Sequence, residues 1–131
     1  MIAFRRTVVC AAALWACGAQ ADPSLECSVS ASSQVEIANC LGEVAEAADT
    51  ALATVLEFAQ NSAAELDGIT ERDVAVPALE TAQSAWLSYR DAQCEYAGAL
   101  FGGGSGTGIE IQSCRIELTR ARIKALESGL R

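Results

Sequence analysis

Four cysteines are the residues in this 131-residue chain with the clearest chemistry, because thiols form disulfide bonds or bind metal ions. They are Cys27, Cys40, Cys94 and Cys114, and two further cysteines lie in an apolar N-terminal segment. An even number in a small exported chain predicts two disulfides, since the compartment is oxidising and a small core needs support. A zinc site would compete, but the chain has no histidine and no C-x-x-C pair, so we expect no metal and no cofactor.

Four cysteines allow three pairings, and spacing alone does not select one. We favour Cys27 with Cys40 and Cys94 with Cys114, because each bond then joins local neighbours and leaves long-range packing to the core. The second bond would close a loop over positions 95–113, and a loop of this length contributes about 3 kcal/mol. That is a large share of the stability of a small domain, which is typically ~5–15 kcal/mol.

The segment FGGGSGTG at positions 101–108 lies between two of these cysteines and invites comparison with phosphate-binding loops. No lysine follows these glycines as a Walker loop requires, and the G-x-G-x-x-G spacing after a strand is absent. Glycine accepts positive φ, so the segment is better suited to a tight reversal between antiparallel helices. Its centre, Gly103, Gly104 and Ser105, is a candidate for contact with a partner.

A second candidate surface precedes the glycine-rich segment. Trp86, Arg90 and Cys94 are spaced by four residues, so they share one helix face, with Tyr89 beside them. Arg90 could lie over an aromatic ring or bond a carboxylate such as Asp91. The face could simply anchor the core, which is the more common use. Alternatively, part of it meets a partner, since Trp, Tyr and Arg dominate binding hot spots.

The first long helix is predicted to begin at Ser33. Ser33 and Glu36 have the S-x-x-E spacing of a capping box, and apolar residues then recur every three or four positions. Gly42 could bend this helix, and the Asp67-Gly68 pair is a stop signal.

Two further helices are predicted after this stop. One begins near Val76 or Pro77, because proline suits a first helical turn, and ends near Leu100. The last begins at a box-like Thr107 and closes at Gly129. With no convincing strand and much alanine, the predicted fold is all-α, a small up-and-down bundle of about three main helices stapled by disulfides.

The N-terminus predicts export. Arg5 and Arg6 precede an apolar run over 8–16, and Ala-Gln-Ala at 19–21 has the form of a cleavage site. We therefore expect a signal peptide at 1–21 and a single domain at 22–131 in the periplasm or outside the cell. No transmembrane span is expected in the mature protein. A lipoprotein cut before Cys17 is the alternative, although Trp15 is bulky for that pattern.

Charge narrows the class of partner. Seventeen acidic residues stand against nine basic ones, and two of the nine, Arg5 and Arg6, belong to the leader. Lysines and arginines must neutralise phosphates, so this balance argues against nucleic acids and anionic membranes. A cationic protein would suit the field better, although acidity can also serve solubility alone.

Several stretches together resemble the LprI-like family of lysozyme inhibitors, which are small exported bacterial domains. The carrying residues are AQSAWLSYRDAQCE at 82–95, GGSG at 103–106, SCRIELTRARIKAL at 113–126 and, more faintly, SSQVEIANC at 32–40 with Ala48-Asp49 and Leu52. Two positions depart from the family pattern, because Arg115 replaces a leucine and no tyrosine lies near Val55. The resemblance implies a helical domain with paired cysteines.

The resemblance also implies binding and inhibition of lysozyme by a protein that is not an enzyme. A structural or adaptor module of the cell envelope, with another protein partner, is the alternative. Catalysis is the least supported class, because the chain has no histidine to act as a base and no G-x-S-x-G elbow. We therefore expect no catalytic residue, and the sequence leaves the oligomeric state open.

Overall fold

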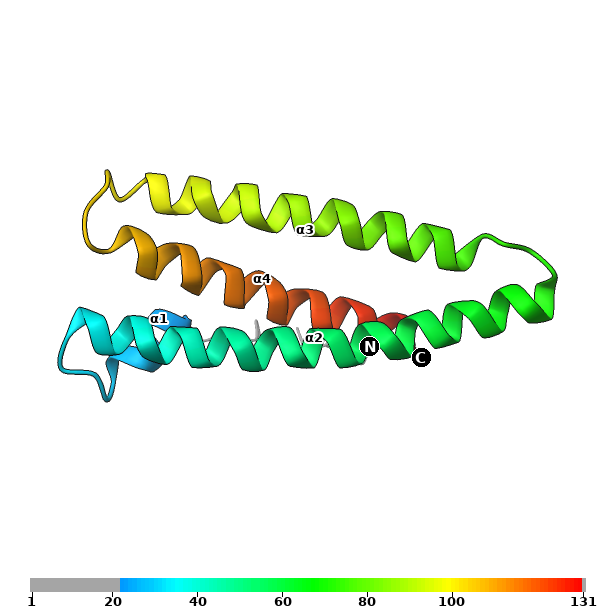
Figure 1. Ribbon diagram of the computed structural model, residues 1–131, viewed down its shortest axis with the longest axis horizontal. Coiled ribbons are helices and arrows are strands. Elements are labelled where there is room, and N and C mark those ends of the chain that lie inside the picture. Colours follow the sequence, from blue (N-terminus) through cyan, green and yellow to red (C-terminus); the bar gives the residue numbers. More distant parts are fainter. Residues whose placement is uncertain (1–21, 131) are drawn as a thin grey trace, which may run out of the picture.

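The computed structural model describes residues 22–130, so the signal peptide predicted at 1–21, with Cys17, lies outside the described residues. Helices make up nearly all of the described chain, which contains no strand, so the all-α prediction is confirmed (Figure 1). The helices are α1 (Pro23–Ser28), α2 (Gln34–Thr70), α3 (Ala75–Ala99) and α4 (Thr107–Gly129). Over residues 22–130, no helix has the length and apolar character needed to cross a membrane.

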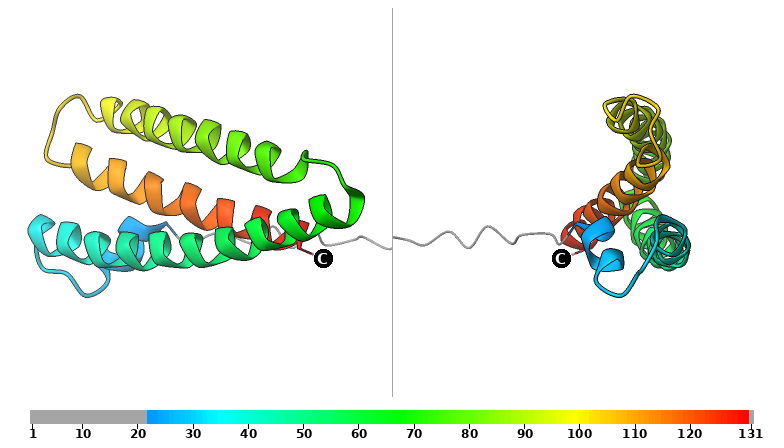
Figure 2. Two further views of the ribbon diagram at one scale, coloured as in Figure 1. Left: turned by 45° about the vertical axis from the view of Figure 1, so that its right-hand side comes forward. Right: turned by 90° about the vertical axis from the view of Figure 1, so that its left-hand side faces the viewer.

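The three long helices run up, down and up, as predicted. α4 lies between α2 and α3 and contacts both along its length, so it forms the centre of the bundle (Figure 2). The short α1 packs against α2 and α4 near the end of the molecule that carries the glycine-rich loop. This arrangement places the loop, α1 and the start of α2 at one end, and the turn between α2 and α3 at the other.

Ser33 caps α2, as the sequence predicts. Its hydroxyl accepts the backbone N–H of Glu36 at 3.3 Å. The return bond of the box differs from the expectation, because the Glu36 carboxylate accepts the N–H of Ser32 instead of that of Ser33. The helix then continues through Gly42, which is exposed and makes no break.

The stop predicted at Asp67-Gly68 is wrong by three residues, since α2 continues to Thr70. A single glycine costs a helix only about 1 kcal/mol, which a long helix tolerates. The helix ends at Glu71, whose φ of 53° is left-handed and whose N–H bonds the Asp67 carbonyl. The Asp67 side chain instead helps to start α3, where its carboxylate accepts backbone N–H groups of the first turn.

α3 ends at Ala99, one residue before the predicted Leu100, and the glycine-rich loop follows. Gly102 and Gly103 have φ values of 65° and 81°, which side-chain-bearing residues rarely adopt, so the reversal needs glycine there. Gly98 serves a different purpose. It is buried against α4, and a Cβ at this position would overlap with the side chain of Ile111.

The start of α4 is predicted correctly, but the capping box is not. Thr107 is the first helical residue, and Gly106 occupies the capping position without a side-chain hydrogen bond. The Thr107 hydroxyl is buried and has no hydrogen-bond partner among the described residues. The prediction failed because Gly106 already adopts helical backbone angles, which moves Thr107 inside the helix.

Both favoured disulfides are present. Cys27 is bonded to Cys40 with an S–S distance of 2.00 Å, and Cys94 to Cys114 at 2.03 Å. The first ties α1 to α2, and the second ties α3 to α4. Both lie in the half of the bundle that carries the glycine-rich loop.

The tightest core lies beside the first disulfide. Cys27, Leu41 and Ile116 are almost completely buried and pack together. Five partly buried residues pack around them: Ile37, Cys40, Val44, Ala45 and Ile109. Beyond this core, large apolar side chains are exposed, among them Phe58, Leu66 and Ile69 toward the other end of the bundle. The buried core and both disulfides therefore lie together in the loop half.

Candidate functional site

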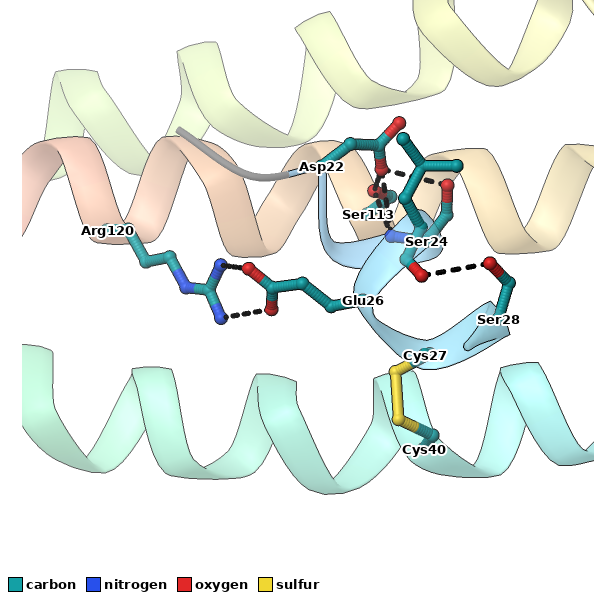
Figure 3. The surroundings of a disulfide bond; sticks show 9 residues. Asp22, Ser24, Glu26, Cys27, Ser28, Cys40, Ser113 and Arg120 are labelled. Atoms are coloured by element: carbon teal, nitrogen blue, oxygen red, sulfur yellow. Dashed lines mark hydrogen bonds and ion pairs between the residues drawn. A yellow bond between two sulfur atoms is a disulfide. The ribbon is translucent and has the colours of Figure 1, made fainter. Parts of the chain in front are cut away.

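The N-terminal arm is fastened to α4 as well as to α2 (Figure 3). One carboxylate oxygen of Asp22 accepts the hydroxyls of Ser24 and Ser113 at 2.8 and 2.9 Å. Glu26 forms a two-pronged ion pair with Arg120, at 3.0 and 3.1 Å. With the disulfide at Cys27, these contacts hold α1 across the bundle.

The pKa of Asp22 reflects this network. Partial burial raises its pKa, but hydrogen bonds from Ser24 and Ser113 and from the backbone outweigh the burial and hold it below the ordinary value. Glu117 shows the opposite result. Partial burial, together with the nearby charges of Asp22 and Glu110, raises the pKa of the Glu117 carboxyl.

Trp86, the first of the predicted contact residues, lies between two arginines. The guanidinium carbon of Arg90 is 5.1 Å from the centre of the Trp86 ring, and that of Arg122 is 5.9 Å away. Both distances are within the range of cation–π attraction. Arg122 is also held by Gln83, whose side-chain oxygen accepts its Nε–H at 3.0 Å. The cluster therefore fastens α3 to α4.

Arg90 joins all three long helices. Its Nη1 donates to Thr119 on α4 at 3.3 Å and to Asp49 on α2 at 3.4 Å, and its Nε donates to Asp91 at 3.3 Å. Only 15% of its side chain is exposed. The sequence raised both a ring and a carboxylate as its partners, and Arg90 has both. This geometry favours the interpretation of the Trp86 face as a packing anchor.

A small cavity of about 190 Å³ adjoins Arg90, and residues of α2, α3 and mainly α4 line it. It is lined by Ala45, Asp49, Arg90, Gln112, Arg115, Ile116 and Thr119. Arg115 pairs with Glu95 at 3.2 Å and with Asp91 at 3.7 Å, so carboxylates already neutralise both arginines of the cavity. An anion would have to displace them, and this cavity is therefore a poor anion site.

The predicted site residues occupy two separate places. Tyr89 is 55% exposed beside the Trp86 cluster, whereas Gly103, Gly104 and Ser105 are exposed in the loop at the end of the bundle. Trp86 lies 13 residues before the end of α3, which corresponds to about 20 Å of helix. A single contact surface would have to extend over that length.

Sequence reasoning missed a group of apolar side chains at the loop end. They come from α1, the start of α2 and the loop, and are exposed: Leu25, Val29, Val35, Leu100 and Phe101. Two of them, Leu25 and Phe101, line a cavity of about 230 Å³ at the same end. Their spacing follows no single helix period, so only the fold brings them together.

Charge is unevenly distributed along the bundle. The residues of the loop half, 22–47 and 91–117, include one basic side chain, Arg115. The acidic side chains in the same ranges are Asp22, Glu26, Glu36, Glu43, Glu46, Asp91, Glu95, Glu110 and Glu117. Most of the negative charge of the domain is therefore gathered around the loop and both disulfides.

Comparison with known proteins identifies one matching family. A model of the lysozyme inhibitor LprI family matches residues 26–126. An uncharacterised protein of Rhizobium meliloti (strain 1021) is 47% identical over 53 residues, which are 40% of this chain and 38% of that protein. The chain thus spans well under half the length of this relative. No solved structure matches this chain. Because the family model covers most of the helical domain and both disulfides, the chain belongs to the LprI lysozyme inhibitor family.

Proposed function

We propose that the domain at 22–131 binds lysozyme and inhibits it by direct association, without catalysing a reaction. The match to the lysozyme inhibitor family over 26–126 carries this proposal. Animal-type lysozymes are strongly basic and cleave glycans in an open cleft with paired carboxylates. An acidic, disulfide-stapled domain has the complementary charge for steering toward such a partner.

The uneven charge of the domain supports a particular orientation. Most of the acidic excess lies in the half that holds the glycine-rich loop, so a basic partner would be drawn to that end. Two disulfides limit the flexibility of this half, which lowers the ordering cost of association. The loop centre, Gly103, Gly104 and Ser105, would then lie at or near the entrance of the cleft.

We further propose that the protein acts outside the cytoplasm after cleavage of the leader at 1–21. Two disulfides fit an oxidising compartment, where they persist. The intact mass of the exported protein measures the cleavage site, lipidation at Cys17 and cysteine oxidation in one experiment. A mass that includes residues 1–21 would contradict cleavage of a signal peptide. A mass increased by a lipid would show that the protein is anchored through Cys17.

Turnover of cell-wall substrate by lysozyme tests the inhibition. We expect the oxidised domain to slow turnover, and the effect to weaken as salt increases, because salt screens attraction between unlike charges. An unrelated acidic helical protein of similar net charge is the control for nonspecific association. Unchanged lysozyme rates at low salt would contradict the proposal. Equal slowing by the control protein would show that the inhibition is not specific to this domain.

A further inference from the structure

We propose that the cavity at the loop end of the bundle binds a lysine or arginine side chain of a basic partner protein. The basic nature of the partner rests on the proposed function, whereas the cavity and its chemistry come from the geometry alone. Residues of α1, the start of α2, the loop and the start of α4 line the cavity. These segments lie at the same end of the bundle (Figure 1). The cavity is separate from the Trp86 cluster, and the loop centre Gly103, Gly104 and Ser105 does not line it.

The walls of the cavity are mainly apolar. Phe101 from the loop, Ile37 from α2 and Ile109 from α4 line it, together with Leu25 from α1. Its volume of about 230 Å³ is sufficient for one long side chain. Lysine and arginine have aliphatic stems that pack against such walls while their charged ends remain near water or a carboxylate.

Glu110 supplies the carboxylate at this cavity. Among the described residues, its side chain has no hydrogen bond or ion pair, and the same holds for Gln34 of α2, which also lines the cavity. Arg115, the one basic side chain in this half, is engaged by Asp91 and Glu95. The positive end of α4 offsets Glu110 by about half a charge, so a net negative charge remains to attract a cation.

The surroundings favour a cation over the other occupants that could enter an apolar cavity. Glu36 and Glu43 lie on α2 in the same half of the bundle, so an anion would be repelled, whereas Glu26 is already paired with Arg120. A purely apolar side chain would fill the walls but would leave Glu110 without a partner. Only an aliphatic cation uses both the apolar walls and the carboxylate.

The cavity is also held in shape before any partner arrives. The disulfides Cys27–Cys40 and Cys94–Cys114 fix the helices that form its walls. Gly106 lies against the Phe101 ring, and a Cβ there would come within 3.0 Å of it. This lack of a side chain lets the ring lie on the loop, and a preformed site loses little entropy on binding.

Titration of the isotope-labelled, oxidised protein with small side-chain analogues tests the chemistry directly. The probes are N-acetyl-lysine amide, N-acetyl-arginine amide and N-acetyl-norleucine amide, which share apolar stems but differ in charge. We expect saturable shifts of the amide signals of Phe101, Gly106 and Glu110, with the cations binding about fivefold tighter than norleucine, as one exposed ion pair allows. Equal binding of all three probes, or shifts confined to other residues, would overturn the proposal.

Two variants with matched controls connect the cavity to the protein partner. Glu110→Gln should remove the preference for cations and weaken lysozyme binding, whereas Glu80→Gln, exposed on α3 and outside the cavity, should change neither. Phe101→Ala should weaken binding of all probes, and Phe58→Ala, equally exposed at the other end, is its control. Circular dichroism verifies that each variant is folded.

The outcomes separate this inference from the proposed function. If the native protein inhibits lysozyme and both Glu110→Gln and Phe101→Ala inhibit equally well, the cavity proposal is wrong and the function stands. If the cation probes bind as expected but lysozyme is not inhibited, the cavity proposal stands and the partner is another basic protein.

Discussion

The carboxylate of Asp67, near the end of α2, accepts a hydrogen bond from the backbone N–H of Val76 in the first turn of α3 at 3.0 Å. It also accepts the N–H groups of Ala75 at 2.8 Å and Val74 at 3.2 Å. These bonds, led by those of Val76 and Ala75, lower the pKa of Asp67 below 3.8. Asp67 thus caps a helix that begins after the turn, at the end of the bundle without a disulfide.

Replacement of Asp67 should destabilise the domain in a pH-dependent way. The stabilisation is present above pH 3.8 and is lost as the pH falls through the lower pKa of the folded state. We therefore expect Asp67→Ala to lower the melting temperature at pH 7, and the difference from the native protein to shrink as the pH falls below the folded-state pKa. Asp73→Asn, in the same turn, is the control. Equal effects of the two changes at pH 7 would contradict a specific cap.

Glu117 should show the opposite dependence. Its raised pKa means that ionisation is less favourable in the folded state, so stability decreases as the pH rises from 4.5 through the folded value. We expect Glu117→Gln to raise the melting temperature at pH 7 and to have little effect well below pH 4.5, where the carboxyl is protonated in both the folded and the unfolded state. A lower melting temperature at pH 7 would argue that the carboxylate makes a favourable contact instead.

Gly98 should not tolerate even one added methyl group. Because its Cβ would overlap with Ile111, Gly98→Ala should separate α3 from α4 and cost about 1–3 kcal/mol of unfolding free energy. Gly42→Ala is a matched control on an exposed helix face with open space, and it should stabilise the protein by about 1 kcal/mol. Chemical denaturation measures both, and the prediction requires that the two changes have opposite signs.

The Cys94–Cys114 bond should supply much of the stability. Replacement of both cysteines by serine should lower the unfolding free energy by about 3 kcal/mol, because the reduced chain regains the entropy of an open loop. The Cys27–Cys40 pair closes a shorter loop, so its removal should cost slightly less. Denaturation of each double variant, and of the native protein with reductant, measures these losses. Stability that is unaffected by reductant would contradict this account.

Arg90 should not be replaceable by lysine. Arg90→Lys keeps the charge but loses the guanidinium that lies over the Trp86 ring and the bonds that reach Thr119 and Asp49 together, at a cost of about 1 kcal/mol. Trp86 is the only tryptophan in 22–131, so its fluorescence reports the change directly. Arg72→Lys, exposed near the far turn, is the control. Unchanged emission and stability in Arg90→Lys would show that the stack contributes little.

Local signals predicted the helices well, because caps and apolar spacing act within a few residues. Ser33 caps α2 as expected, and α3 begins at Ala75, one or two residues before the predicted start at Val76 or Pro77. The helix stop predicted at Asp67-Gly68 was wrong, because a glycine permits a helix to end without forcing it to end. The Asp67 carboxylate instead accepts the backbone N–H of Val76, nine residues further along the chain.

The candidate site was less predictable, because its contacts cross between helices. The contacts of Arg122 with Trp86 and of Thr119 with Arg90 depend on how α4 is rotated relative to α3. The spacing of residues within one helix does not determine that rotation. The apolar cavity around Phe101 and Ile109 likewise needs four segments to meet. Only the pairing of the cysteines linked segments in advance.

The central position of α4 has a consequence for how the chain matures. α4 packs against both α2 and α3 but is synthesised after them. Neither α2 nor α3 can therefore pack against α4 when it is first made. Cys27 and Cys40 can join early, whereas Cys94 must remain a free thiol until residue 114 arrives. During that interval an oxidising catalyst can join Cys94 to Cys27 or Cys40. Early formation of the Cys27–Cys40 bond prevents this, because neither thiol is then free to react.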